Sequence, residues 1–275
     1  MRGTMTLLYV EHSLERAWQA IGRSNYSEAR TAALEAVAAV SVEPSGADRD
    51  QFASRAHETL GVVARDRGEF RRAHLEFHRA RLYADRAGDA RSTGRVLVAD
   101  IVTTQIANRG RTRRPAFSRL QTKFQVAHAA IIASGADDLR ADLLHRLAVQ
   151  RVAIGDRRGA VDLLRNHVIR VSENVEDADM QLARWVELAR TEIQLDPRRR
   201  RAIDDVFEQA GQLALDATQP LRRMQLATVQ AERALEEQGP SDEFWHYLSA
   251  ARTHLETGSY ANPHYDRLLR RATRG

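Results

Sequence analysis

The chain has 275 residues, of which 43% are hydrophobic and 6% aromatic, with 15 glycines and 6 prolines. This length suits one repeat array or two modest domains, and the composition favours helix throughout. The absence of cysteine excludes disulfides and thiolate chemistry, and no apolar run is long enough for a membrane span or a signal-peptide core, so we expect a cytoplasmic protein.

The net charge of +5 comes from 42 basic residues, of which only Lys123 is a lysine, against 37 acidic residues. An arginine bias of this strength is typical of a GC-rich genome rather than of selection for phosphate contacts. The acidic and basic residues are interleaved, as on solvated helix faces. Net basicity is therefore weak evidence for a nucleic-acid partner.

A helical hairpin is predicted over residues 10–43. Apolar residues line one face of its first helix, namely Leu14, Ala17, Trp18 and Ile21. Its second helix carries an aromatic residue followed by three alanines on the same helical face: Tyr26, Ala29, Ala33 and Ala36. Small residues at these positions let two helices approach closely.

The same pattern recurs over residues 54–87, at Phe70, Ala73, Phe77 and Ala80. This stretch resembles a single tetratricopeptide repeat (TPR), a helix–turn–helix unit of 34 residues. Leu60 and Gly61 stand where the family has its Leu-Gly pair, and Gly68 stands at the turn. The resemblance implies stacked neighbours, because one such unit cannot bury its apolar face alone. It also implies an extended surface that holds a partner.

Further hairpins follow along the chain. A third clear unit is predicted over residues 141–174, with Arg157 where the family has an aromatic residue. More degenerate units are predicted over residues 92–133, 177–216 and 219–257, and a capping helix over 263–273. Together with the TPR resemblance, they predict an all-α, right-handed superhelical solenoid of about six antiparallel hairpins, built as a single domain over residues 1–275.

Enzyme signatures are missing from the sequence. It contains no glycine-rich phosphate loop and no strand–turn–helix context for a nucleophilic serine. His74 and His78 are four residues apart on a predicted helix, but further metal ligands are lacking. Adjacent carboxylate pairs such as Asp204 and Asp205 diverge around a helix, so they do not form an acid/base pair. We therefore expect a non-enzymatic protein without a metal or other cofactor.

The TPR resemblance implies that residues on the first helix of each hairpin line a concave groove that binds a peptide. The positions that match in this sequence are Arg55, Glu58, Arg65, Asp100, Thr104, Asn108 and His145. Polar groups on a helix flanked by other helices are unfavourable unless they face a groove or a partner. Asp100, Thr104 and Asn108 are equally consistent with hydrogen bonding to neighbouring helices. The Lys and Asn clamp that some TPR proteins use to bind chaperone C-terminal carboxylates is absent.

A run of arginines follows the third predicted first helix and interrupts the repeat pattern. Contacts to phosphates or to an acidic partner are conceivable for Arg109, Arg111, Arg113, Arg114, Arg119 and Lys123. Basic loop surface in an arginine-rich chain accounts for the same residues and is the favoured interpretation. A nucleic-acid-binding protein that uses these clusters is the alternative function.

The sequence therefore predicts a TPR-like scaffold or regulatory protein that binds a peptide or protein segment. Its hairpins resemble the sensor region of bacterial regulators, but we expect no DNA-binding domain before the repeats. A homodimer is compatible with the pattern, because the ends of a solenoid expose apolar faces unless they are capped. We expect no membrane partner.

Overall fold

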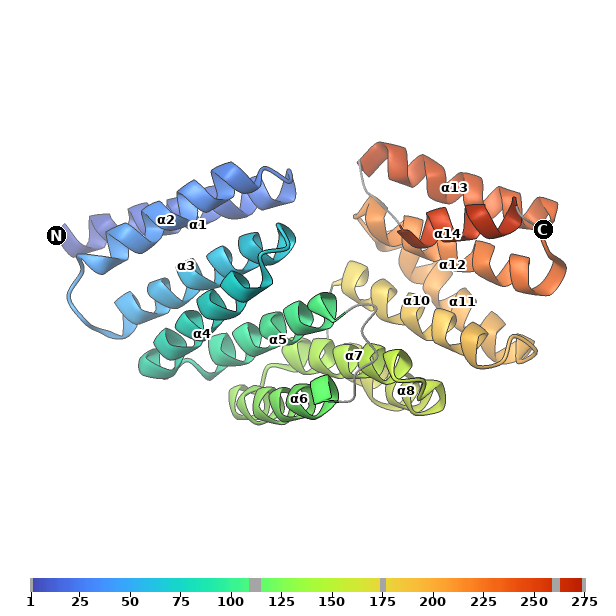
Figure 1. Ribbon diagram of the computed structural model, residues 1–275, viewed down its shortest axis with the longest axis horizontal. Helices are drawn as coiled ribbons and strands as arrows, with labels where there is room; N and C mark the ends of the chain where they lie inside the picture. The colour runs from blue at the N-terminus through green and yellow to red at the C-terminus, as the bar shows by residue number, and fades with distance from the viewer. Residues whose placement is uncertain (1, 109–114, 174–176, 259–262, 274–275) are drawn as a thin grey trace. The chain divides into compact units, whose positions relative to one another are not determined.

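The structure of the protein, a computed structural model, describes residues 2–108, 115–173, 177–258 and 263–273. Side chains are not described at 2–5, 115–119, 256–258 and 263. Within these ranges all regular secondary structure is helical (Figure 1), which confirms the predicted all-α class. Over the same ranges, no helix combines the length and apolar character needed to cross a bilayer.

The chain divides into two compact units, Met1–Arg146 and Leu147–Gly275. The boundary falls inside helix α7 (Asp137–Ala153). The prediction of a single domain over residues 1–275 stays a prediction, and the two units are described separately below.

The first unit consists of helices α1 to α6 and most of α7. Their bounds are α1 Arg2–Gly22, α2 Tyr26–Ser41, α3 Ala47–Asp66, α4 Phe70–Ala87, α5 Ala90–Ala107 and α6 Pro115–Ser134. Consecutive helices pair as the hairpins α1–α2, α3–α4 and α5–α6. The first helices of these hairpins also contact one another, α1 with α3 and α3 with α5.

Local sequence signals account for where these helices begin and end. The Asn25 side chain accepts a hydrogen bond from the backbone N–H of Glu28 at the start of α2, and Asp89 accepts one from Ser92 at the start of α5. Such caps satisfy N–H groups that have no partner within the helix. Gly88, with φ of 69°, ends α4 in the left-handed conformation that glycine adopts without strain.

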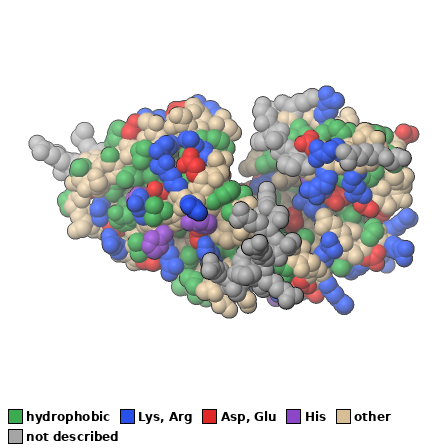
Figure 2. Space-filling view, in the orientation of Figure 1, with side chains coloured by type: hydrophobic (Ala, Val, Ile, Leu, Met, Phe, Trp, Pro, Cys, Tyr) green, Lys and Arg blue, Asp and Glu red, His purple; other side chains and the backbone are tan. Residues whose placement is uncertain are grey.

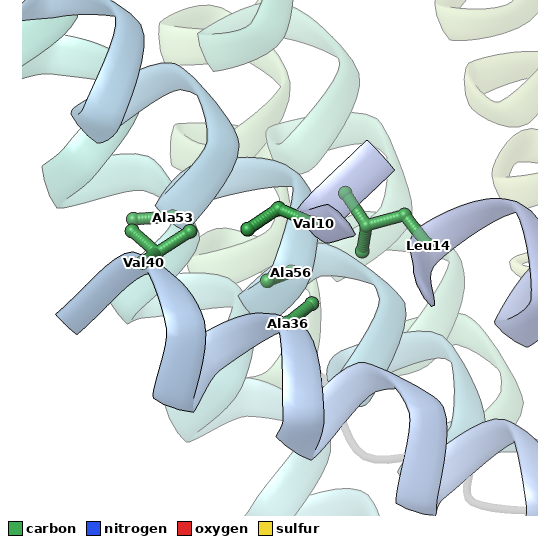
Figure 3. Close-up of a cluster of buried hydrophobic side chains, with 6 residues drawn as sticks. All are labelled: Val10, Leu14, Ala36, Val40, Ala53 and Ala56. Carbon is green, nitrogen blue, oxygen red and sulfur yellow. The ribbon is translucent and has the colours of Figure 1, made fainter. Parts of the chain in front are cut away.

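The core of the first unit consists of alanines against larger apolar side chains, as the spacing predicts. Figure 3 shows one cluster in which residues of α1, α2 and α3 meet: Val10, Leu14, Ala36, Val40, Ala53 and Ala56. In the second hairpin, a Cβ atom at Gly61 would lie 2.6 Å from the Phe77 ring. Only glycine fits there, which explains the Leu-Gly pair.

The second unit contains two full hairpins and a terminal helix. After the last residues of α7, a continuous helical run follows: α8 Arg157–Leu163, the π-helical segment η1 Leu164–Val168 and α9 Ile169–Ser172. The hairpins are α10 Ala178–Leu195 with α11 Arg200–Asp216, and α12 Pro220–Gln238 with α13 Asp242–Gly258. Helix α14 (Pro263–Ala272) contacts both α12 and α13, and its Leu268 is buried against Phe244 and Leu248, as expected of a capping helix.

Candidate functional site

The first helices of the first unit present a row of charged residues, which we call the first-helix face: Glu11, Arg55, Glu58, Arg91 and Arg95. Here the three helices are linked in series. Arg55 of α3 lies 3.8 Å from Glu11 of α1. Glu58 of α3 accepts two hydrogen bonds, at 2.9 and 3.0 Å, from Nε of Arg95 on α5. Arg91 of α5 then pairs with Asp138 of α7 at 2.7 Å.

Exposure differs sharply between Glu58 and the arginines of this face. The Glu58 side chain is only 8% exposed, whereas those of Arg55, Arg91 and Arg95 are 39, 56 and 41% exposed. Burial raises the pKa of Glu58 above its ordinary value, although Arg95 opposes that shift. The arginines therefore present cationic groups to solvent, while the carboxylate that orients Arg95 lies beneath them.

Asp100 and Thr104 point away from this face. They follow Arg95 by five and nine residues, which places them about 140° and 180° around the helix from it. The Asp100 carboxylate contacts Nδ1 of His74 on α4 and lies 2.6 Å from Nζ of Lys123 on α6. Lys123 also donates to Oγ1 of Thr104 at 3.0 Å. The geometry agrees with the second alternative for these two residues, hydrogen bonding to neighbouring helices.

These contacts surround a pocket of about 250 Å³ between α4 and α6, with α5 at its floor. We call it the basic pocket, and its lining residues are His74, Phe77, His78, Arg81, Val96, Leu97, Asp100 and Lys123. Figure 2 shows histidine side chains at the surface over α4. Arg81 and Lys123 carry positive charge against the single carboxylate of Asp100, so the pocket is cationic.

Asp100 stays ionised inside this pocket. Burial would by itself raise the pKa of its carboxyl group, but hydrogen bonds and positive charge from His74 and Lys123 outweigh the burial. The pKa of Asp100 consequently lies below the ordinary value for aspartate. The carboxylate therefore holds Lys123 and His74 in place at neutral pH.

The other predicted site residues lie in several places. Arg65 pairs with the adjacent Asp66 at 2.7 Å, Asn108 follows the last residue of α5, and His145 is partly buried on α7. Arg109, Arg111, Arg113 and Arg114 lie outside the described residues, and Arg119 lies on α6 where side chains are not described. Of the predicted arginine-rich cluster, the structure thus places only the side chain of Lys123.

The second unit contains a pocket of about 300 Å³ at the corresponding place, between α11 and α13 with α12 at its floor. We call it the acidic pocket, and its lining residues are Asp204, Phe207, Gln230, Arg233, Ala234, Glu237, Glu243 and Tyr247. Arg233 lies 2.6 Å from Asp204 and 3.1 Å from Glu237. Three carboxylates against one guanidinium group make this pocket anionic.

Several other buried carboxylates are paired with basic groups. Glu76 lies 2.8 Å from His57, and Glu192 lies 2.7 Å from Arg165 and 2.6 Å from Arg199. Among the described residues, no group of three or more His, Asp or Glu side chains could hold a metal ion. These pairs join neighbouring helical segments.

Sequence reasoning missed Arg95 and Arg81 as site residues and treated His74 and His78 only as a metal pair. Two signals pointed to the basic pocket. His74 and His78 are spaced by one helical turn, and Lys123 is the single lysine of the chain. Neither signal identifies Asp100 as the common neighbour, because that contact joins three helices.

No family model matches the chain, and no curated protein matches it. Several solved structures have a similar fold. One is PilF of Pseudomonas aeruginosa, with 16% identity and a TM-score of 0.51 over 95% of this chain and 97% of that one. Another is Nro1, described as a hypoxic regulator of sterol synthesis and a nuclear import adaptor, with 11% identity and a TM-score of 0.52 over 98% of this chain and 94% of that one. A second structure of the Schizosaccharomyces pombe Nro1 has 10% identity and a TM-score of 0.50 over 97 and 98%. These proteins are TPR-like helical-repeat proteins, and the likeness supports a shared fold.

Proposed function

We propose that this protein is a non-enzymatic helical-repeat scaffold that binds an extended, acidic segment of a partner protein along its first-helix face. The observation that carries the proposal is the row of half-exposed arginines on α3 and α5, oriented by the buried Glu58. Guanidinium groups held in this way bind carboxylates through charge-assisted hydrogen bonds.

The arrangement of the first helices supports the choice of an extended ligand. Contacts of α1 with α3 and of α3 with α5 bring Arg55 and Arg95 into one line across successive hairpins. The structural neighbours include a protein described as a nuclear import adaptor, which is compatible with a scaffold role for this fold. Fold likeness alone does not determine function, so the arginine row is the stronger support.

Site-specific photo-cross-linking in extract of the host cells tests this proposal. We expect a photo-reactive phenylalanine at Arg91, on the first-helix face, to form an adduct with a protein whose cross-linked peptide is rich in Asp and Glu. The same replacement at Arg79 is the matched control, because that arginine of α4 is 49% exposed but lies off the face. Substitution of Arg55 and Arg95 by alanine should reduce the Arg91 adduct at least about tenfold, since charged hydrogen bonds are each worth about 1.5–3 kcal/mol.

Equal adducts at Arg91 and Arg79, or no adduct at Arg91, would contradict a first-helix binding face. A nuclease-sensitive adduct would instead favour the nucleic-acid alternative, whose affinity should fall steeply as salt rises.

A further inference from the structure

We infer that the basic pocket is a second binding site, independent of the first-helix face, and that it takes a small organic monocarboxylate with an apolar body. The site lies on the side of α5 opposite Arg95, so it does not depend on a ligand at the first-helix face.

The walls of the pocket supply donors for an anion. His74, His78 and Arg81 face it from α4 and Lys123 from α6, while the Asp100 carboxylate on α5 accepts from Lys123. Lys123 has three N–H groups, and the contacts to Asp100 and Thr104 use two of them. Arg81 contacts Asp85 at 3.4 Å through Nε and also lines the pocket, and its guanidinium group has further N–H donors.

Charge balance favours a single negative charge on the ligand. Among the residues that line the pocket, Arg81 and Lys123 carry two positive charges against one negative charge on Asp100, and Asp85, which pairs with Arg81, is outside the lining, so one carboxylate neutralises these lining charges. Asp100 also fixes the position of Lys123, which lowers the entropy lost on binding.

The floor of the pocket requires an apolar body on the same ligand. Phe77, Val96 and Leu97 are among the lining residues, so an apolar group that enters lies against apolar side chains. The volume of about 250 Å³ is below the usual range for drug-sized ligands. An acid with about ten non-hydrogen atoms, such as phenylacetate, fits these limits.

Calorimetry and NMR with phenylacetate test the inference on the full chain. We expect a dissociation constant on the order of 1 mM at pH 6, with shifts of the ring signals of His74 and His78. Three comparison ligands separate the contributions of the charge and of the apolar group. Acetate lacks the apolar group, phenylacetamide lacks the charge, and inorganic phosphate has a different anionic group and no apolar group. Each should bind at least about tenfold more weakly than phenylacetate. Equal or tighter binding of phosphate would overturn the choice of a carboxylate.

Substitutions then locate the site. Lys123→Met combined with Asp100→Asn removes the ion pair without leaving a lone buried charge, and should weaken phenylacetate binding at least about tenfold. Arg79→Gln on α4 and Arg233→Met in the acidic pocket are matched controls and should leave it unchanged. Circular dichroism checks that each variant is folded. His78→Gln, at an exposed position, gives a second test, and it should weaken phenylacetate binding about two- to fivefold. Absence of binding to the wild type, or equal losses in the controls, would overturn the inference.

Discussion

The basic and acidic pockets occupy the same place in their hairpins but carry opposite charge. Each lies between two second helices with the intervening first helix at its floor, and a charged residue of that floor helix pairs with groups of opposite charge. In the first unit this residue is Asp100, between His74 of α4 and Lys123 of α6. In the second unit it is Arg233, which pairs with Asp204 of α11 and with Glu237 of its own helix. A repeat architecture therefore supplies the crevice, and the charged residues that the flanking second helices add to it set the sign of its charge.

The largest expected effect tests whether the basic pocket depends on close packing in its own hairpin. Gly61→Val places a side chain against the Phe77 ring, which also lines the pocket. We expect a loss of about 2–3 kcal/mol in the free energy of unfolding, because the ring must move. Urea denaturation measures this, and hydrogen exchange should show the loss in the first unit rather than the second.

Gly211 of α11 is the control for that substitution. A Cβ atom there would meet no other atom within 4 Å, so Gly211→Ala should stabilise the protein by about 0.5–1 kcal/mol through helix propensity. Destabilisation by both substitutions to the same extent would show that packing does not distinguish these two glycines.

A second prediction compares the cations of the two pockets. Lys123→Met leaves the Asp100 carboxylate, 18% exposed, without one of its two basic partners, and should lower the free energy of unfolding by about 2 kcal/mol. Arg233→Met should lower it by about 1 kcal/mol, because Asp204 is 58% exposed and remains hydrated, while Glu237, although 14% exposed, keeps Arg200 at 3.9 Å. Urea unfolding midpoints of the two variants provide the test. The reverse order would contradict the view that only the first pocket depends on its ion pair.

The double variant Lys123→Met with Asp100→Asn sharpens the same comparison. Removing both charges avoids a partly paired buried carboxylate, so its stability should exceed that of Lys123→Met alone. Additive losses from the two single substitutions would argue against direct coupling.

The smallest effect concerns how stability depends on pH through two carboxylates, Asp100 in the basic pocket and Glu58 on the first-helix face. The pKa of Asp100 is lowered in the folded state, so its contribution to stability is present above the ordinary aspartate pKa and is lost as pH falls. The pKa of Glu58 is raised, so its contribution is present at low pH and is lost as pH rises. Between pH 3 and 6, Asp100→Asn should therefore make the rise of stability with pH shallower, and Glu58→Gln should make it steeper.

Urea unfolding at several pH values measures these slopes. Glu11, which is 57% exposed, offers a control, since Glu11→Gln should change the slope less than either buried substitution. Identical slopes for the Asp100 and Glu58 variants would contradict the opposite pKa shifts.

Helix positions were predictable because their signals are local. Pro220 starts α12 and Gly239 follows its end, as the pattern indicated. The alanine spacing around Ala29 and Ala33 correctly predicted a buried face, since residues three or four apart share one side of a helix. The resemblance at residues 54–87 placed Gly61 at the family's Leu-Gly position, and the structure shows that the Phe77 ring approaches it closely.

The groove residues were harder to predict because they depend on how each helix is rotated against its neighbours. Spacing alone shows that Asp100 and Thr104 share a side of α5 and that Arg95 lies on another. It does not tell which side faces α3 and which faces α4 and α6. The structure places Arg95 beside Glu58 and Asp100 beside Lys123, and it is this rotation that separates the first-helix face from the basic pocket.

The sequence by itself determined the all-α class, several helix ends and the residues that share a helical face, because periodicity, caps and glycine turns act within a few residues. Only the tertiary structure decided which polar residues meet across helices and which cations border a pocket. Contacts such as His74–Asp100–Lys123 join three helices whose relative rotation depends on the packing of the whole unit.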